Sequence, residues 1–535
     1  MLKHLHRAGL AVALAGAAVA AQADGPGSLG RVEHVLLISV DGLHAVDLSN
    51  YVQGHPQSTL AALSAHGVTY TNNSTSSPSD SFPGLASLVT GGSPNTAGLW
   101  YDVTWNRAVG PQAVVNPIMG SASTGSCPGT VGAEVEFDEG ADIDLTRLDA
   151  GGGINPQYLP VNATTCQPIW PHQYLRVNTI FEVVHAHGQR TAWTDKHPAY
   201  EWTNGPSGKG VDDFYGPEIN SIPVALPYPG CTPVPFPDPT PDDGWTTSFA
   251  NIMCYDSTHV QAVLNQINGW THDGKKHVGI PALFGTNFQA VSVGEKLLAD
   301  PVQTSVAGGY LDVLGTPAAG LASELDFVDR SLGSMVAELK KVGAYNSTLI
   351  IISAKHGQSP IDHSKLHPIG GGQPQALIGS AEAFDISDDG SLIWLTDPSL
   401  APGVVSLLSQ PASQTTLGIQ EIIAGNLLSD KFNAPTQDPR TPDIILKVNT
   451  GVIFTGGSKI AEHGGLNEDD VHTALLVSNP GLRASSVNAA VSNQQVAATV
   501  VRALGYSPGE LQAVQKEGIH VLPFLFGDDD NQNRQ

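Results

Sequence analysis

Two apolar runs that each end in a polar motif constrain the fold of this chain most. Residues 34–40 lead into Asp41-Gly42, and residues 347–353 lead into Lys355-His356-Gly357. An unbroken apolar run of this length indicates a strand that is buried on both faces, as in a parallel sheet covered by helices. Residues 321–341 have apolar side chains at spacings of three and four, which predicts a long amphipathic helix. We therefore expect an α/β fold with a mostly parallel central sheet flanked by helices.

Weaker signals extend this core along the chain. They predict three further strands and three further helices: strands at 68–70, 443–448 and 473–478, and helices at 60–66, 84–90 and 494–504. Between residues 105 and 260 Gly, Pro, Asn and Thr dominate and the periodicity weakens, so we expect an insertion that caps the site. The expected core is then 24–104 and 261–510, and a polar acidic tail follows at 527–535.

The charge of the chain disfavours one large class of function. The 535 residues include 50 acidic and 25 basic side chains, which gives a formal net charge of −25. Nucleic-acid-binding proteins have a basic surface, and an acidic surface repels polyanions. We therefore expect a small substrate and no nucleic-acid polymer as partner. The oligomeric state does not follow from the sequence.

The first 23 residues have the pattern of a secretory signal. Lys3 and Arg7 precede an apolar run at 8–21, and Ala21-Gln22-Ala23 offers the small residues of a signal-peptidase site. The alternative is a transmembrane anchor, but about 14 apolar residues are too few, since a bilayer needs about 20. No later run reaches 18 uninterrupted apolar residues, so no membrane span is expected. The chain is predicted to be secreted, to the extracellular space or a periplasm, after cleavage near Ala23.

The four cysteines fit an oxidising compartment. All of them lie in the predicted insertion, at Cys127, Cys166, Cys231 and Cys254. Such an even number indicates two disulfides, which three pairings can satisfy. Sequential pairing, Cys127 with Cys166 and Cys231 with Cys254, closes the shorter loops and is our prediction. A Cys₄ metal site is disfavoured because the C-x₂-C spacing is missing.

Three polar segments near predicted strand ends are candidates for chemistry. Asp41 follows the first strand, where open α/β sheets bind ligands, although such an Asp is also a common turn residue. Ser81 lies just ahead of a predicted helix whose free N–H groups would stabilise an anion, although an ordinary N-cap serine occupies the same position. His356 and His463 each precede Gly, and imidazole is a frequent Zn²⁺ ligand, although a single His is more often structural.

In their order these motifs resemble the alkaline phosphatase superfamily, most closely its type I phosphodiesterase/nucleotide pyrophosphatase branch. The resemblance covers roughly residues 31–110 and 320–505. It rests on these motifs: Asp41-Gly42, Ser81-Phe82-Pro83, Leu88-Val-Thr90-Gly91, Pro94-x-x-x-Gly98, Asp329 within a helix, and the His-Gly motifs at 356 and 463.

The resemblance implies a role for each of these polar residues. Ser81 stands where the family keeps its nucleophile and is also a metal ligand. Asp41 and His356 match further ligands of one metal ion, and His463 matches a ligand of the other. The implied chemistry is hydrolysis through a covalent phosphoserine, assisted by one or two divalent ions, with Zn²⁺ as the foremost candidate.

The chain departs from the family pattern at three places. Lys355 stands where the family has a metal-binding Asp, and Gly84 stands where it has an Asn. In place of an Asp-x-x-x-His pair, the stretch 284–291 offers the amides Asn287 and Gln289. The usual two-metal ligand set is therefore incomplete, since Zn²⁺ sites use at least three protein ligands.

Two arrangements could complete the site. In the first, Lys355 acts as a catalytic cation in place of one ion, beside a single metal near Asp41, Ser81, His356 and Asn287. In the second, Asp195 and His197 of the insertion bind metal or substrate. The alternative for Asp195 and His197 is a polar loop with an internal salt bridge.

The sequence thus predicts a secreted, metal-dependent hydrolase of small phosphate esters, with diesters preferred. One alternative is an inactive binding module that kept the fold, which the departures from the family pattern motivate. The other is a single-metal transferase or sulfatase-like enzyme. A sulfatase is disfavoured because the segment before Ser81 lacks the Arg of the sulfatase nucleophile motif.

Overall fold

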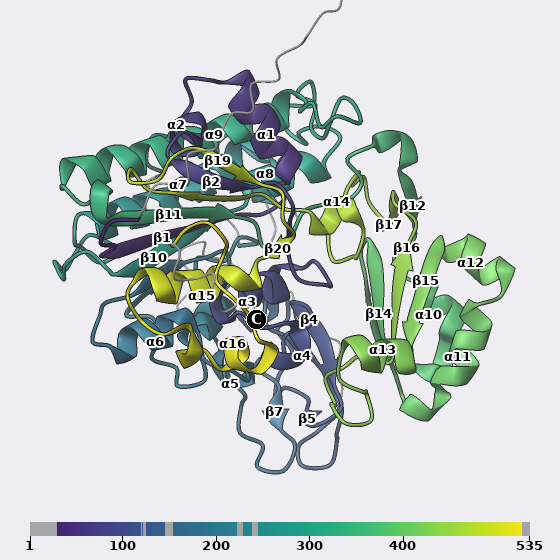
Figure 1. Cartoon of the computed structure of the whole chain (residues 1–535). Coiled ribbons are helices and arrows are strands. Elements are labelled where there is room, and N and C mark those ends of the chain that lie inside the picture. The colour runs from purple at the N-terminus through teal and green to yellow at the C-terminus, as the bar shows by residue number, and fades with distance from the viewer. Residues whose placement is uncertain are drawn as a thin grey trace, which may run out of the picture.

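The computed structural model describes residues 29–118, 120, 123, 125–144, 153–221, 228–237 and 244–526 (Figure 1). The predicted signal peptide at 1–23 and the acidic tail at 527–535 lie outside the described residues. Among the helices described, none has the length and apolar character needed to cross a membrane.

A central eight-stranded sheet forms the core of the fold. Its strands follow the order β19-β2-β18-β11-β1-β10-β8-β9. Their bounds are β19 (Ser485–Val487), β2 (Gly67–Tyr70), β18 (Leu475–Ser478), β11 (Thr348–Ser353), β1 (His34–Val40), β10 (Leu283–Phe288), β8 (Ala192–Thr194) and β9 (Asp213–Tyr215). Only β18 runs antiparallel to its two neighbours in this sheet; the other described pairs are parallel. The predicted fold class, a mostly parallel central sheet flanked by helices, is confirmed.

Helices cover both faces of this sheet, as Figure 1 shows. One layer contains α1 (Ala45–Gly54), α2 (Thr59–Ser64), α7 (Phe249–Ile267), α8 (Ala290–Lys296) and α9 (Ala319–Lys341), and the other contains α3 (Ser81–Thr90), α6 (Ile180–Ala186) and α15 (Gln494–Ala503). Strand β1 serves both layers because successive side chains of a strand point to opposite faces. Val35 and Leu37 pack in one hydrophobic core, and Leu36, Ile38 and Val40 in the other. Burial on both faces explains why β1 reads as an unbroken apolar run.

A second, four-stranded antiparallel sheet lies beside this core. Its order is β13-β14-β16-β15, with β13 (Glu382–Ser387), β14 (Gly390–Leu395), β16 (Ile444–Val448) and β15 (Ile419–Ala424). The helices α10 (Gln373–Ile378), α11 (Ala401–Leu408) and α12 (Pro411–Leu417) accompany it, and residues of this region form a separate hydrophobic core. The strand predicted at 443–448 belongs to this sheet, outside the central one.

The remaining elements are short. The two-stranded pairs are β3 (Asn73–Ser74) with β20 (Val491–Ser492), β4 (Val103–Asn106) with β6 (Ala133–Glu136), β5 (Val109–Gly110) with β7 (Val161–Asn162), and β12 (His367–Ile369) with β17 (Val452–Phe454). The short helices are α4 (Pro94–Ala97), α5 (Pro171–Tyr174), α13 (Asn426–Lys431), α14 (Glu468–Val471) and α16 (Gln512–Glu517).

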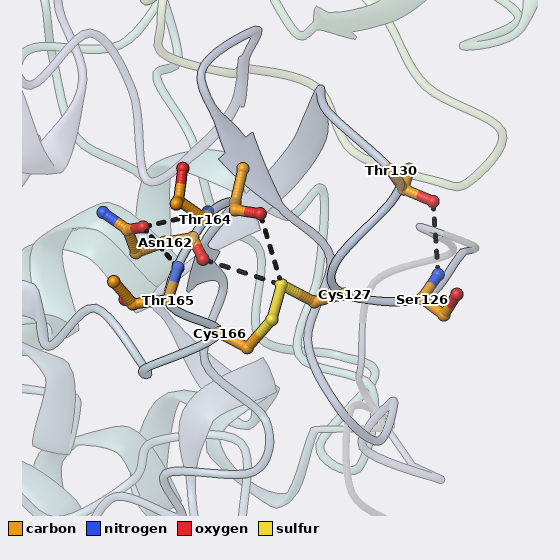
Figure 2. Close-up of a disulfide and its surroundings, with 8 residues drawn as sticks. Ser126, Cys127, Thr130, Asn162, Thr164, Thr165 and Cys166 are labelled. Carbon is orange, nitrogen blue, oxygen red and sulfur yellow. Dashed lines mark hydrogen bonds between the residues drawn. A yellow bond between two sulfur atoms is a disulfide. The ribbon is translucent and has the colours of Figure 1, made fainter.

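The segment predicted to be an insertion, 105–260, divides between two roles. Strands β8 and β9 join the central sheet, and α6 and most of α7 cover it, so the central sheet draws on residues from both sides of the boundary predicted at 104. The rest of the segment is loop-rich; one disulfide lies within it, and the other joins it to Cys254 of α7. The predicted pairing is confirmed: Cys127 bonds to Cys166, and Cys231 bonds to Cys254. In Figure 2 the first of these bonds joins two loops, and Asn162 Oδ1 accepts hydrogen bonds from the backbone of Thr164 and Thr165 beside it.

Candidate active site

Polar side chains gather at the carboxyl edge of the central sheet. The register pairs Ser39 of β1 with Asn287 of β10 and with Ser353 of β11, so these strands end side by side. Asp41 and Lys355 therefore leave the sheet at the same edge, close to Asn287. Strand β8 brings Asp195 to this edge from a position far along the chain.

Ser81 is the first residue of helix α3. Asp80, rather than Ser81, is the N-cap residue, and its Oδ1 accepts a hydrogen bond from the Phe82 backbone N–H at 3.2 Å. The helix predicted to begin at Gly84 begins at Ser81, so Ser81 lies within it, because Asp80 takes the capping position that its side chain favours. The free N–H groups and the dipole at this helix end stabilise negative charge near Ser81.

A lysine that the sequence analysis did not single out contacts the Ser81 hydroxyl. Lys196 Nζ donates a hydrogen bond to Ser81 Oγ at 2.9 Å. Burial alone would lower the pKa of Lys196, but carboxylates that include Asp41 raise it above its ordinary value, so the ammonium form is favoured. Ser81 is fully buried, and Lys196 is 8% exposed. A protonated lysine in this position stabilises an alkoxide on Ser81.

Asp41 is held by partners that converge on one of its oxygens. Asp41 Oδ2 accepts hydrogen bonds from Gln289 Nε2 and, at 3.3 Å, from Asn287 Nδ2. The ammonium nitrogens of Lys196 and Lys355 lie 3.6 and 3.9 Å from the same oxygen. Burial opposes ionisation, but Lys355 and other positive neighbours hold the pKa of Asp41 well below its usual range. The second oxygen, Oδ1, has no hydrogen-bond partner in the structure.

Lys355 is buried and paired with Asp195. Its Nζ donates to Asp195 Oδ1 at 2.7 Å and lies 4.0 Å from the centroid of the Tyr200 ring. Trp193 Nε1 donates to the other oxygen of Asp195 at 3.0 Å, which fixes the carboxylate. Burial lowers the pKa of Lys355 and raises that of Asp195, while their mutual attraction opposes both shifts. A buried carboxylate and an aromatic face thus orient a cation next to Asp41.

A close backbone contact explains why position 84 is a glycine. A Cβ there would lie 2.0 Å from the carbonyl oxygen of Lys355, so α3 packs directly against the backbone that follows β11. The Asn expected from the family pattern does not fit in this contact. Gly84 therefore brings the start of α3 close to the lysine that replaces the family's Asp.

The rings of His356 and His463 lie against each other beside the cluster, tilted by 32°. Their ring centroids are 3.8 Å apart. His356 Nε2 lies 3.5 Å from Asp41 Oδ2, and His463 Nδ1 lies 3.7 Å from Asp80 Oδ2. Burial lowers the pKa of both rings, which favours their neutral forms, and burial raises the pKa of Asp80. The facing atoms His356 Nε2, His463 Nδ1 and Asp80 Oδ2 have no hydrogen-bond partner in the structure.

The two insertion residues that were singled out go to different places. Asp195 reaches the site, where it holds Lys355. His197 instead contacts Glu218, with Nδ1 2.7 Å from Oε1. The partner of His197 Nδ1 thus lies outside the loop, whereas the alternative considered for this loop was a salt bridge within it.

A sequence model of the type I phosphodiesterase/nucleotide pyrophosphatase family matches residues 35–122 and 314–472. Three solved structures share the fold. Murine ectonucleotide pyrophosphatase/phosphodiesterase 5 gives a TM-score of 0.52 at 14% identity, over 89% of this chain and 96% of its own. The human protein gives 0.53 at 14%, over 94% and 99%. The alkaline phosphatase PafA gives 0.56 at 13%, over 89% and 96%.

The family match and the shared fold support the alkaline phosphatase superfamily, in its type I phosphodiesterase/nucleotide pyrophosphatase branch. No curated protein sequence matches it. The superfamily resemblance drawn from the motifs is thereby confirmed, and both matched segments carry residues of the polar edge: Asp41, Ser81, Lys355, His356 and His463.

Members of this superfamily typically depend on divalent metals, but the side chains of this member do not fit a two-metal site. Asp41 Oδ2, the oxygen nearest to His356, is already engaged by two amides. Two ammonium groups lie within 4 Å of it and would repel a metal ion. Among the described residues, the predicted ligands Asp41, His356 and His463 do not form a group of three whose ligand atoms come within 4.8 Å of one another.

Among the described residues, one group of three possible metal ligands does have its ligand atoms within 4.8 Å of one another. It consists of His44 and Asp47 at the start of α1 and Glu295 in α8. His44 Nδ1 is 2.9 Å from Asp47 Oδ2, and Tyr310 donates to Glu295 Oε1 at 2.7 Å. Hydrogen bonds connect all of these side chains, so the group is a satisfied polar network.

Proposed function

We propose that this chain is a secreted hydrolase of phosphate esters in which Ser81 is the nucleophile and forms a covalent phosphoserine. The observation that carries the proposal is the 2.9 Å hydrogen bond from Lys196 Nζ to Ser81 Oγ at the N-terminus of α3. A cation and a helix N-terminus both stabilise a serine alkoxide and the phosphoryl oxygens next to it. The family match supports the same reaction class.

The reaction proceeds in two displacements. Ser81 Oγ attacks phosphorus, the Oγ–P bond forms, and the bond to the leaving oxygen breaks. The serine proton passes to that oxygen, so a neutral alcohol departs. Water then attacks the phosphoserine, the Oγ–P bond breaks, and a proton from the water restores the serine hydroxyl. Lys196 stabilises the charge on Oγ in both steps, and Lys355 is the second cation at the site.

A small diester is the substrate class that we propose. Two ammonium groups, Lys196 and Lys355, face two carboxylates, Asp41 and Asp195, so the site has little net positive charge. Such a site suits the single charge of a phosphodiester better than the double charge of a monoester. An inactive variant of murine ectonucleotide pyrophosphatase/phosphodiesterase 5 was solved in complex with AMP. This relative supports a nucleotide-like group on the substrate.

Three of the sequence predictions stay predictions within this proposal. They are the signal peptide with cleavage near Ala23, export to the extracellular space or a periplasm, and the one or two divalent ions. The two disulfides support export, since they form in oxidising compartments. The ligand geometry described above does not support the second ion.

The first experiment replaces the nucleophile. Ser81→Ala should reduce hydrolysis of bis(p-nitrophenyl) phosphate to the background rate and leave the thermal unfolding midpoint unchanged, because only one buried hydroxyl is lost. Brief mixing of the wild-type chain with substrate, followed by acid quench and peptide mass spectrometry, should place one phosphoryl adduct on Ser81. Ser79→Ala is a matched control, since Ser79 Oγ instead donates to the Asp470 carbonyl at 2.8 Å.

Two outcomes would contradict this function. Retained turnover in Ser81→Ala would remove Ser81 as nucleophile. A wild-type chain without turnover of phosphate or sulfate esters would favour the binding-module alternative, for which the full burial of Ser81 is the supporting observation.

A further inference from the structure

Two lysine ammonium groups surround the carboxylate that the family uses to bind metal. Lys355 comes from the end of β11, and Lys196 comes from the end of β8, 115 residues from Ser81 in sequence. Their nitrogens lie 3.9 and 3.6 Å from Asp41 Oδ2. Only Lys355 stands at a position of the family motif; Lys196 reaches the same place through the fold.

We propose that Lys196 and Lys355 replace the metal ions of the family, so that this site hydrolyses phosphate esters without a bound metal. The inference rests on the proposed function and states how that function is achieved.

Lys196 makes the contacts that a metal ion would make beside a nucleophile. Such an ion contacts the nucleophilic oxygen, neutralises its charge and is anchored by a carboxylate. Lys196 Nζ donates to Ser81 Oγ at 2.9 Å and is anchored by Asp41 at 3.6 Å. A third contact, to Gln289 Oε1 at 3.5 Å, limits its rotation. Its exposed fraction is 8%, whereas Ser81 and Lys355 are fully buried.

Lys355 supplies the second positive charge in a fixed orientation. Asp195 accepts from it at 2.7 Å, and the Tyr200 ring lies against it. Asp195 is in turn held by Trp193 Nε1 and by the Lys196 backbone N–H at 2.9 Å. The single segment from 193 to 200 thus provides Lys196 together with Asp195 and Tyr200, which orient Lys355.

The amides complete the replacement. Where the family has an Asp-x-x-x-His pair, Asn287 and Gln289 donate to Asp41 Oδ2. Amide nitrogens are hydrogen-bond donors and do not bind metal ions. They fix the Asp41 carboxylate by hydrogen bonds, so this carboxylate is oriented without coordination to a metal. The departures at 287, 289 and 355 therefore all favour a site whose carboxylate is held without a metal ion.

The first test removes metal from the whole mature chain. The chain is dialysed against a chelator until elemental mass spectrometry finds substoichiometric metal, and hydrolysis of bis(p-nitrophenyl) phosphate is then measured. We expect unchanged turnover, and a loss of about 10²- to 10³-fold in kcat for Lys196→Met, as for removal of one charge-stabilising donor. Lys196→Arg should recover part of this loss. Lys275→Met, which changes an exposed lysine, is the matched control.

The outcomes separate the inference from the function on which it rests. Turnover that disappears with the metal and returns with added Zn²⁺ overturns the inference and leaves the hydrolase function in place. Turnover that persists in Lys196→Met also overturns it. A chain without turnover, with or without added Zn²⁺, Mg²⁺ or Mn²⁺, overturns the proposed function and the inference together.

The second test measures metal binding without activity. Isothermal titration of Zn²⁺ into the wild-type chain should show no stoichiometric site at the Ser81 edge. The double variant Lys355→Asp with Lys196→Met removes both ammonium groups and restores the family's Asp-His-Gly motif, so it should bind Zn²⁺. Stoichiometric binding by the wild-type chain that Asp41→Asn abolishes would overturn the inference.

Discussion

Two buried polar clusters each include a residue that follows β1 closely, Asp41 in one and His44 in the other. They differ in how many of their polar atoms have a hydrogen-bond partner. The Ser81 cluster comprises Asp41, Ser81, Lys196, Lys355 and His356. It leaves Asp41 Oδ1 and His356 Nε2 without partners. The His44 cluster comprises His44, Asp47, Glu295, Tyr310 and Gln358. There, each polar side-chain atom has a partner within the structure.

The difference separates a structural role from a functional one. Buried polar groups are almost always paired, because an unpaired one loses its hydration without compensation. A complete network such as the His44 cluster therefore stabilises the fold and offers nothing to a ligand. The Ser81 cluster holds two cations and unpaired acceptors at the sheet edge where α/β proteins bind ligands. Substitutions in the first should reduce stability, and those in the second activity.

The largest effect is expected at Lys355, which has both a structural role, as the partner of Asp195, and a functional one, as a cation of the site. Lys355→Met leaves Asp195 buried without its counter-ion, which should lower the free energy of unfolding by about 3–5 kcal/mol. Lys355→Met combined with Asp195→Asn removes both charges and should recover most of that loss. Both variants should lack activity, because the second cation is missing. Urea unfolding followed by tryptophan fluorescence measures the first effect, and diester hydrolysis measures the second.

Two outcomes would contradict an ion pair between Lys355 and Asp195. If the single variant were as stable as the wild-type chain, or the double variant no more stable than the single one, Lys355 would not be paired as a charge with Asp195.

A smaller effect is expected from the His44 cluster. Tyr310→Phe deletes a hydroxyl that bonds to Asp47 and Glu295, and it should lower the free energy of unfolding by about 1–3 kcal/mol. The activity per folded molecule should stay at the wild-type value, since Tyr310 does not contact the Ser81 cluster in the structure. Ser81→Ala should give the opposite pattern, with lost activity and unchanged stability. A Tyr310→Phe variant with normal stability and reduced kcat would contradict the division between the clusters.

The sequence predicted the parts of the molecule that depend on local pattern. Strand β1 could be predicted because burial on both faces requires an unbroken apolar run. Helix α9 could be predicted because burial on one face requires apolar residues at spacings of three and four. The His-Gly and Ser-Phe-Pro motifs indicated the superfamily because each motif is a short run of neighbouring residues and the motifs follow the family's order along the chain. The disulfide pairing followed from loop length alone.

What the sequence did not predict depends on contacts between distant segments. The four-stranded sheet pairs strands from separate parts of 382–448, and its β16 has the same apolar pattern as a central strand. Strand β8 is only three residues long, too short for a periodic signal, yet it positions Asp195 and Lys196. Lys196 was visible only as the residue between Asp195 and His197. Its contact with Ser81 arises from the order of strands in the sheet, which one sequence does not reveal.

The most gradual effect is a pH dependence of stability that comes from the His44 cluster. Burial raises the pKa of Glu295 to about 7, although His44 opposes this shift. A raised pKa means that the folded chain binds a proton more tightly than the unfolded chain, so the contribution is present at low pH. It is lost as pH rises from the unfolded value of about 4.3 through the folded value.

We therefore expect the free energy of unfolding of the wild-type chain to fall between about pH 5 and about pH 7, by at most about 1.4 kcal/mol per pH unit for this proton. Glu295→Gln removes the titrating group and keeps a polar side chain of the same shape, so the variant should show a flatter profile over this window. Its stability should approach that of the wild-type chain at the acidic end, where Glu295 is already neutral. The measurement is urea unfolding of both chains across the window, with Glu33→Gln as a control for a half-exposed carboxylate whose side chain lies 3.5 Å from Arg31. Parallel profiles of the wild-type chain and Glu295→Gln would mean that Glu295 does not take up a proton on folding, and the His44 cluster would then bury a full charge.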